Sequence, residues 1–243
     1  MSDNLVIAPD NGNTSKMNVF QRVISAVFSP GRLMYELEQK PRVLLGIILT
    51  AIAPAIMMLG TFPMFKEYLR TTLEATYANM GMQISPEMFE NILNGSVIST
   101  PVIGGVMAGL ILLVEALVVW LVLKIFKGQG RFKQVLSVMG YSSVITVLGA
   151  IVSVIAIQLT GTYSDVTYTS LAAFMPDMKG SFIFGAARSL DVFNIWYFVC
   201  ASIGVATVSK VDNKKAYLVM VILLIVIAAF GGYNEVKSAA LLN

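Results

Sequence analysis

The chain has 243 residues, of which 56% are hydrophobic and only 13% are charged, and its net charge is +3. A composition this apolar indicates a protein whose solvent is lipid. The positive charge comes without a basic stripe and interleaved aromatic residues, which excludes nucleic acid as a partner. Histidine is absent and Cys200 is the single cysteine, so histidine chemistry, histidine or cysteine metal sites and disulfides within the chain are excluded.

The first 42 residues are expected to lie outside the hydrocarbon. Residues 1–16 are rich in Asn, Asp, Ser and Gly, which is typical of a flexible tail. Residues 17–28 place apolar side chains on one helical face with Arg22 elsewhere. Such a helix is too short to span, so we expect it to lie on the inner leaflet. A second short helix is expected over 31–39, after Ser29-Pro30 as N-cap and first position.

Five long apolar runs dominate the rest of the chain. Each is near the roughly 20 residues that a helix needs to cross about 30 Å of hydrocarbon. The sequence therefore predicts an all-α polytopic membrane protein built as a five-transmembrane-helix bundle. The runs cover residues 43–61, 101–126, 134–159, 190–209 and 214–232, which divides the chain into a tail (1–16), cytoplasmic interfacial helices (17–42), a membrane domain (43–233) and a short outer tail (234–243).

The loop between the first two runs has helical signals of its own. Residues 63–80 carry apolar side chains at helical spacing, and Ser85-Pro86 begins a second short helix that we expect to end at Gly95. Thr100-Pro101 repeats the same start signal, so the second span is expected to begin there as a separate helix.

Basic residues predict the orientation of the bundle. Twelve of the 17 lysines and arginines fall in three segments that lie on one side if all five runs cross, and the positive-inside rule makes that side cytoplasmic. The N-terminus is then inside and the C-terminus outside. The three segments hold Lys16, Arg22, Arg32, Lys40 and Arg42; Lys124, Lys127, Arg131 and Lys133; and Lys210, Lys214 and Lys215.

Several polar and small residues within the runs are candidates for a function or for helix packing. Glu115 lies midway along the second run, where an ionised carboxylate costs several kcal/mol unless it is paired, protonated or wetted. It is either a proton or cation site, a contact with a partner helix, or a hydrogen-bonded group that fixes packing. Asp191 begins the fourth run as an N-cap, and Asn194 extends a polar cluster there. Gly105 and Gly109 form a GxxxG pair for close helix packing, within the chain or between subunits.

Short motifs in a particular order connect these parts. They are Phe28-Ser29-Pro30, Pro41, the turn from Phe126 to Lys133, Gly140-Tyr141, and Leu190-Asp191-x-Phe-x-x-Trp196. Over about residues 18–232 this order resembles the Yip domain family of Rab/Ypt-interacting membrane proteins, in its bacterial branch. The resemblance implies five transmembrane helices and a cytoplasmic N-terminus.

The same resemblance bears on partners. In eukaryotic members it implies binding of prenylated Rab GTPases. This chain lacks the long N-terminal region with its Asp-Leu-Tyr-Gly-Pro segment, and it reads Ser-Ser-Val after Gly140-Tyr141, which argues against Rab-type GTPase binding. Bacterial relatives are similar to accessory proteins of the cytoplasmic membrane, some of them connected with ABC-type export.

Three functions therefore remain open. The leading hypothesis is a non-enzymatic accessory or scaffold protein that uses no cofactor and binds the lipid bilayer and another membrane complex, such as an ABC-type exporter, or a second copy of itself. Its candidate contact is the basic turn with Lys127, Gln129, Arg131, Phe132 and Lys133. The alternatives are a small transporter or channel that uses Glu115, and a membrane-shaping or trafficking protein.

Overall fold

The computed structural model describes residues 17–242, so the expected tail over 1–16 lies outside the described residues. Within this range, five helical segments are long and apolar enough to cross a membrane. They are α3 (Val43–Gly60), α5 (Pro86–Ile125), the pair α6 (Phe132–Ser142) and α7 (Val144–Thr160), α9 (Val192–Ser209) and α10 (Asn213–Leu242). The predicted all-α bundle with five membrane helices is confirmed.

Two short helices precede the first span, as the sequence predicts. α1 (Val19–Phe28) starts with a capping box between Asn18 and Gln21, and α2 (Pro30–Gln39) starts at the proline after Ser29. The apolar face of α1 is exposed, with Phe20 at 72% and Phe28 at 80%, whereas Arg22 on the other face is buried. The side of the helix that faces the protein therefore carries Arg22 together with the small or branched residues Ala26, Val23 and Val27.

Close approaches between glycines bring α3 against α5 and α6. A Cβ on Gly46 of α3 would lie 2.8 Å from the Cα of Gly140 in α6. A Cβ on Gly105 of α5 would meet the Ala51 carbonyl oxygen of α3, and Gly109 faces Ile47 of the same helix. Small residues permit this backbone contact, which replaces the hydrophobic driving force that lipid does not supply.

The core lies among α2, α5, α6 and α9. Tyr141, Leu33, Met139 and Val205 are fully buried there. Outward side chains such as Ile103 and Val106 on α5 and Ile225 on α10 are exposed and apolar. This pattern is opposite to that of a soluble bundle and fits a surface that contacts lipid.

α5 differs from the prediction, because the expected short helix ending at Gly95 and the separate span starting at Thr100-Pro101 form one continuous helix of 40 residues. Pro101 lies inside it and is buried on the same stripe as Val97 and Gly105. A proline normally interrupts a helix, but inside a bundle its neighbours hold the helix straight enough for it to continue. The start signal at Ser85 is real, since its Oγ accepts from the Met88 amide at 3.4 Å.

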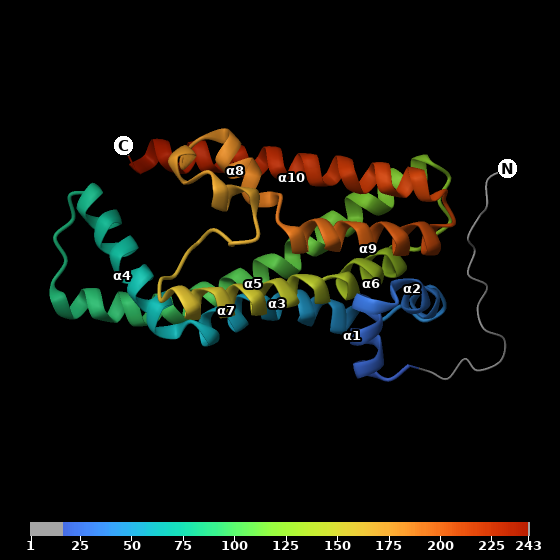
Figure 1. Cartoon of the computed structure of the whole chain (residues 1–243), viewed down its shortest axis with the longest axis horizontal. Coiled ribbons are helices and arrows are strands. Elements are labelled where there is room, and N and C mark those ends of the chain that lie inside the picture. The colour runs from blue at the N-terminus through green and yellow to red at the C-terminus, as the bar shows by residue number, and fades with distance from the viewer. Residues whose placement is uncertain (1–16, 243) are drawn as a thin grey trace.

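The chain between α7 and α9 folds back on the bundle. It contains two 3₁₀ turns (Leu171–Phe174 and Pro176–Met178) and α8 (Phe182–Ser189). In Figure 1 it returns from the end of α7 toward α10, and α8 lies on α10.

The C-terminal residues after 233 were expected to form a short tail, but α10 continues to Leu242. Gly185 of α8 packs against Gly231 and Gly232, and Glu235 accepts from the Gly180 amide at 3.1 Å. Contact with α8 therefore extends the helix beyond its apolar run.

Figure 1 separates two ends of the bundle. The basic end comprises α1, α2 and the turns 126–131 and 210–212. The loop end comprises α4 (Phe62–Asn79), the segment 161–191 and the last turns of α10. The three basic segments of the sequence thus share one end, as the charge pattern requires if every run crosses.

Candidate functional site

The turn between α5 and α6 is held by hydrogen bonds on both sides. α5 ends at Ile125, Lys127 adopts φ +61°, and the Gly128 amide donates to the Leu123 carbonyl at 2.8 Å. The Trp120 indole donates to the Gly130 carbonyl at 3.0 Å. A turn with this many backbone contacts presents its side chains in fixed positions.

The same turn touches the end of α9. The Gln129 amide donates to the Ser209 carbonyl at 2.8 Å, and a Cβ on Gly130 would lie 2.8 Å from the Val208 carbonyl oxygen. Only glycine permits this approach at position 130. The turn is therefore anchored to a third span, α9, in addition to the two that it joins.

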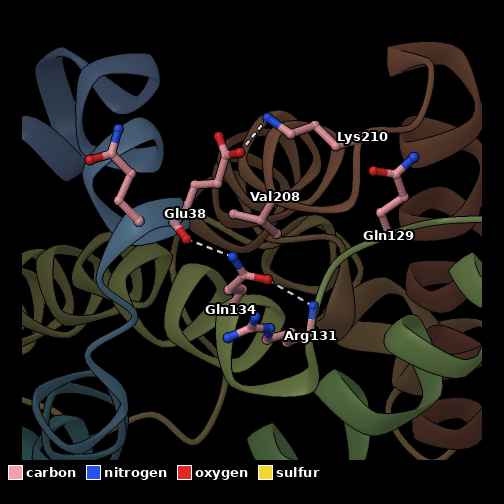
Figure 2. Close-up of a pocket in the computed structure, with 7 residues that line it drawn as sticks. Glu38, Gln129, Arg131, Gln134, Val208 and Lys210 are labelled. Atoms are coloured by element: carbon pink, nitrogen blue, oxygen red, sulfur yellow. Dashed lines mark hydrogen bonds and ion pairs between the residues drawn. The ribbon is translucent and has the colours of Figure 1, made fainter.

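A polar cavity of about 310 Å³ opens beside this turn, between α2, α6 and the end of α9. Figure 2 shows Lys210 and Glu38 pointing toward one another, where they form an ion pair. Gln134 connects the two sides, since its Nε2 donates to the Glu38 carbonyl at 2.6 Å and its Oε1 accepts from the Arg131 amide at 2.8 Å. We call this the basic-end cavity; its lining is completed by Gln39, Gln129 and Val208.

The candidate contact residues of the turn differ in exposure. Lys127, Gln129, Arg131 and Lys133 are exposed, and the structure records no ion pair for these three cations among residues 17–242. Phe132 is half-buried and packs edge-on against Trp120, with the ring centroids 6.1 Å apart. The turn thus offers charge and hydrogen-bonding groups, while Phe132 belongs to the packing beneath them.

A buried ion pair supports the basic end from below. Arg22 of α1 donates to Glu36 of α2 at 2.6 Å through Nη2 and at 3.0 Å through Nε, and the Arg22 side chain is 4% exposed. The hydrogen bond with Glu36 raises the pKa of Arg22 above its ordinary value, against the opposing effect of burial. Glu36 Oε2 and the Tyr141 hydroxyl are buried without hydrogen-bond partners among the described residues.

The polar residues predicted within the spans do not form one site. Glu115 lies on the inward stripe of α5 between Leu112 and Val119, half-buried, and it lines neither the basic-end cavity nor the cavity described below at α9. Asp191 caps α9, since its Oδ1 accepts from the Phe193 amide at 2.8 Å. Asn194 Nδ2 donates to the Ser189 carbonyl at 2.7 Å.

Gly105 and Gly109 face α3 of the same chain, through Ala51 and Ile47. Their spacing on α5 is therefore occupied by a contact within the chain. Among the described residues, no cluster of three or more carboxylate or cysteine side chains has the arrangement of a metal site.

Sequence reasoning missed the partners that the turn meets in space. Glu38, Gln134 and Lys210 line the basic-end cavity, although they come from three segments far apart in the chain. Their polarity next to the membrane was the available signal, but only the packed bundle brings them together. The Arg22–Glu36 pair was missed for the same reason, because the two residues lie on different helices.

Comparison with known proteins identifies the family. The Yip1 domain model matches residues 24–233. The membrane protein YknW of Bacillus subtilis is 30% identical over 142 residues, which cover 57% of this chain and 59% of that protein. No solved structure matches. With the family model covering nearly all of the membrane domain, the chain belongs to the Yip1 domain family.

Proposed function

We propose that this chain is a non-enzymatic accessory protein of the bacterial cytoplasmic membrane that binds another membrane complex through its basic end. We propose an ABC-type exporter as this partner. The observation that carries the proposal is the anchored turn, where Lys127, Arg131 and Lys133 are exposed in fixed positions without a recorded ion pair in residues 17–242. Such a surface fits an acidic patch on a neighbour at the inner leaflet.

We infer that the basic end lies in the cytoplasm and the C-terminus outside. This inference rests on the positive-inside rule, applied to three basic segments that share one end of the bundle. Because the turn is already held in place, little conformational entropy of the turn is lost when a partner binds.

The test is affinity co-purification from native membranes in mild detergent, comparing the parent with the double variant Arg131→Gln and Lys133→Gln. Both side chains are exposed, and Lys124 at the end of α5 and Lys127 in the turn remain to preserve orientation. The yield of the partner complex should fall by a factor of about three to ten, because rim charges govern encounter and selectivity.

The matched control is Lys179→Gln with Lys237→Gln, which removes the same charge from exposed positions at the loop end. It should leave the yield unchanged. A cysteine at Gln129 in a Cys200→Ser background should resist an impermeant thiol reagent in intact cells, whereas one at Asn79 should react. An undiminished complex with the first double variant, or labelling at Gln129 alone, contradicts the proposal.

A further inference from the structure

A second cavity lies at the start of α9, deep in the bundle. It measures about 240 Å³ and is lined by residues of α3, α7, α9 and the segment before α9. We call it the α9 cavity. It shares no residue with the basic-end cavity.

The depth of the α9 cavity follows from contacts along α7. Gln158 Nε2 donates to the Gly60 carbonyl at 2.5 Å, so the ends of α3 and α7 are level. A Cβ on Gly149 would lie 3.0 Å from Phe193 Cβ, so the first turn of α9 packs there. Gly149 precedes Gln158 by nine residues, or about 14 Å at the helical rise. α9 therefore begins well inside the span of its neighbours.

Non-helical backbone at this depth needs protein or a wet cavity around it. Thr167 and Thr169 lie in the segment that returns from the end of α7, and both line the α9 cavity. Their hydroxyls donate to Asp191 Oδ2, Thr167 at 2.9 Å. The returning segment thus brings polar groups to the level where α9 starts.

The hydroxyl groups of α7 also donate their hydrogens to acceptors within the protein. The Thr146 hydroxyl donates to the Ser143 carbonyl at 2.7 Å, and the Ser153 hydroxyl donates to the Gly149 carbonyl at 2.9 Å. A hydroxyl carries one proton and two lone pairs. All four hydroxyls in the lining therefore present only acceptor lone pairs to a ligand.

Asp191 adds a negative charge to this wall. It accepts from two backbone amides, Phe193 at 2.8 Å and Asn194 at 3.3 Å, besides the two threonine hydroxyls. None of the other nine described lining residues is ionisable, so the carboxylate meets no opposite charge in the cavity wall. In a medium of low dielectric such a wall attracts a cation that donates hydrogen bonds and repels an anion.

Asn194 also lines the cavity, and one of its two Nδ2 hydrogens is donated to the Ser189 carbonyl at 2.7 Å. The remaining lining is apolar. Met57, Gly149, Ala150 and Phe193 form it, and an aromatic face also attracts an ammonium group. The volume lies below the roughly 300–1,000 Å³ of sites for drug-sized ligands, so the occupant is short.

We propose that the α9 cavity binds a short amphiphilic amine, with its ammonium group among the hydroxyl oxygens near Asp191 and its alkyl body against Met57, Ala150 and Phe193. An ammonium group has three donors and no acceptor, which matches a wall made mostly of acceptors. A headgroup that also carries phosphate fits poorly, because its oxygens meet no hydroxyl donor and only the second Nδ2 hydrogen of Asn194. This inference is independent of the function proposed for the basic end.

The probe is octylammonium, tested on Ser153→Cys in a Cys200→Ser background reconstituted in lipid nanodiscs. Iodoacetamide should alkylate this cysteine through the cavity. Octylammonium should slow the alkylation by about tenfold, which corresponds to about 1.4 kcal/mol. Octanol and octanoate have the same chain without the ammonium group, and each should slow it less than about twofold.

The charge is tested with Asp191→Asn, since asparagine also caps helices well. This variant should lose the protection by octylammonium, whereas Asp165→Asn, an acid that does not line the cavity, should keep it. As a second measurement, octylammonium should raise the apparent unfolding temperature of the parent more than octanol does, and Ala150→Leu, which fills the cavity, should abolish the difference. Equal protection by octanoate, a cysteine that never reacts, or an unchanged difference in Ala150→Leu would each overturn the inference.

Discussion

The Arg22–Glu36 ion pair at the basic end lies much deeper than the Arg188 ion pairs at the loop end. At the basic end the Arg22 side chain is 4% exposed and forms an ion pair with Glu36 at 2.6 Å. At the loop end the Arg188 side chain is 36% exposed and reaches Asp165 at 3.4 Å and Glu235 at 3.3 Å. A buried charge depends strongly on its partner, whereas water substitutes for a partner at an exposed one. We infer that the basic end is a unit that tolerates little change and that the loop end adapts.

The largest expected effect comes from removing the buried ion pair at the basic end. Arg22→Ala leaves the Glu36 carboxylate under α1 without its partner, so the free energy of unfolding should fall by about 3 kcal/mol. Chemical unfolding of the purified protein in detergent measures the change.

The matched control removes both charges. Arg22→Met combined with Glu36→Leu should recover most of the lost stability, because apolar residues of similar size replace a buried pair at little cost. If the single variant is as stable as the parent, the pair does not hold α1 and α2 together.

A smaller effect is expected when the loop end is changed in the same way. Arg188→Ala should lower the free energy of unfolding by about 1 kcal/mol or less, since solvent screens a side chain this exposed. It also loses a hydrogen bond to the Asp165 carbonyl at 2.8 Å. Lys179→Ala, which removes a looser contact to Asp165, should change stability less still. A loss from Arg188→Ala that equals the loss from Arg22→Ala would remove the distinction between the ends.

The smallest effect concerns the contact of α4 with the segment 161–191 within the loop end. The Tyr163 ring lies 4.9 Å from Tyr68 and 5.3 Å from Phe65, centroid to centroid. Burial raises the pKa of Tyr163, with smaller contributions from Tyr68 and Asp165. The folded state then keeps a proton that the unfolded state releases near pH 10, so stability is fully present below about pH 10 and declines above it.

Tyr163→Phe should flatten this decline. Unfolding temperatures of parent and variant, measured between about pH 8 and 11, would show converging values at neutral pH and a smaller drop for the variant in alkali. A parallel drop in both proteins would show that another group titrates there.

Much of the fold was predictable from local pattern. The short helices at the basic end follow from Pro30 and from the amphipathic spacing around Arg22, and the family follows from short motifs in order. The start of α9 follows from Asp191, whose carboxylate caps the helix as its residue type suggests. Local signals failed at Pro101, because packing around a buried proline outweighed its tendency to end a helix.

The candidate site was predictable only in part. The basic turn and its exposed charges could be read from the spacing of Lys127, Arg131 and Lys133. The cavity beside it could not, since Glu38 and Lys210 meet across α2 and α9. The exposure of Phe132 could not be predicted either, because it depends on the Trp120 ring beneath it.

The sequence by itself determined that this protein is a five-helix membrane bundle with its basic segments at one end, because apolar length and charge act locally and add up along a chain. Only the tertiary structure decided what the polar residues near and within the membrane do. Arg22 is buried with Glu36, Asp191 lies deep beside returning threonines, and Glu115 joins neither cavity. The physical reason is that the cost of a polar group in lipid depends on which partners reach it, and those partners come from distant segments.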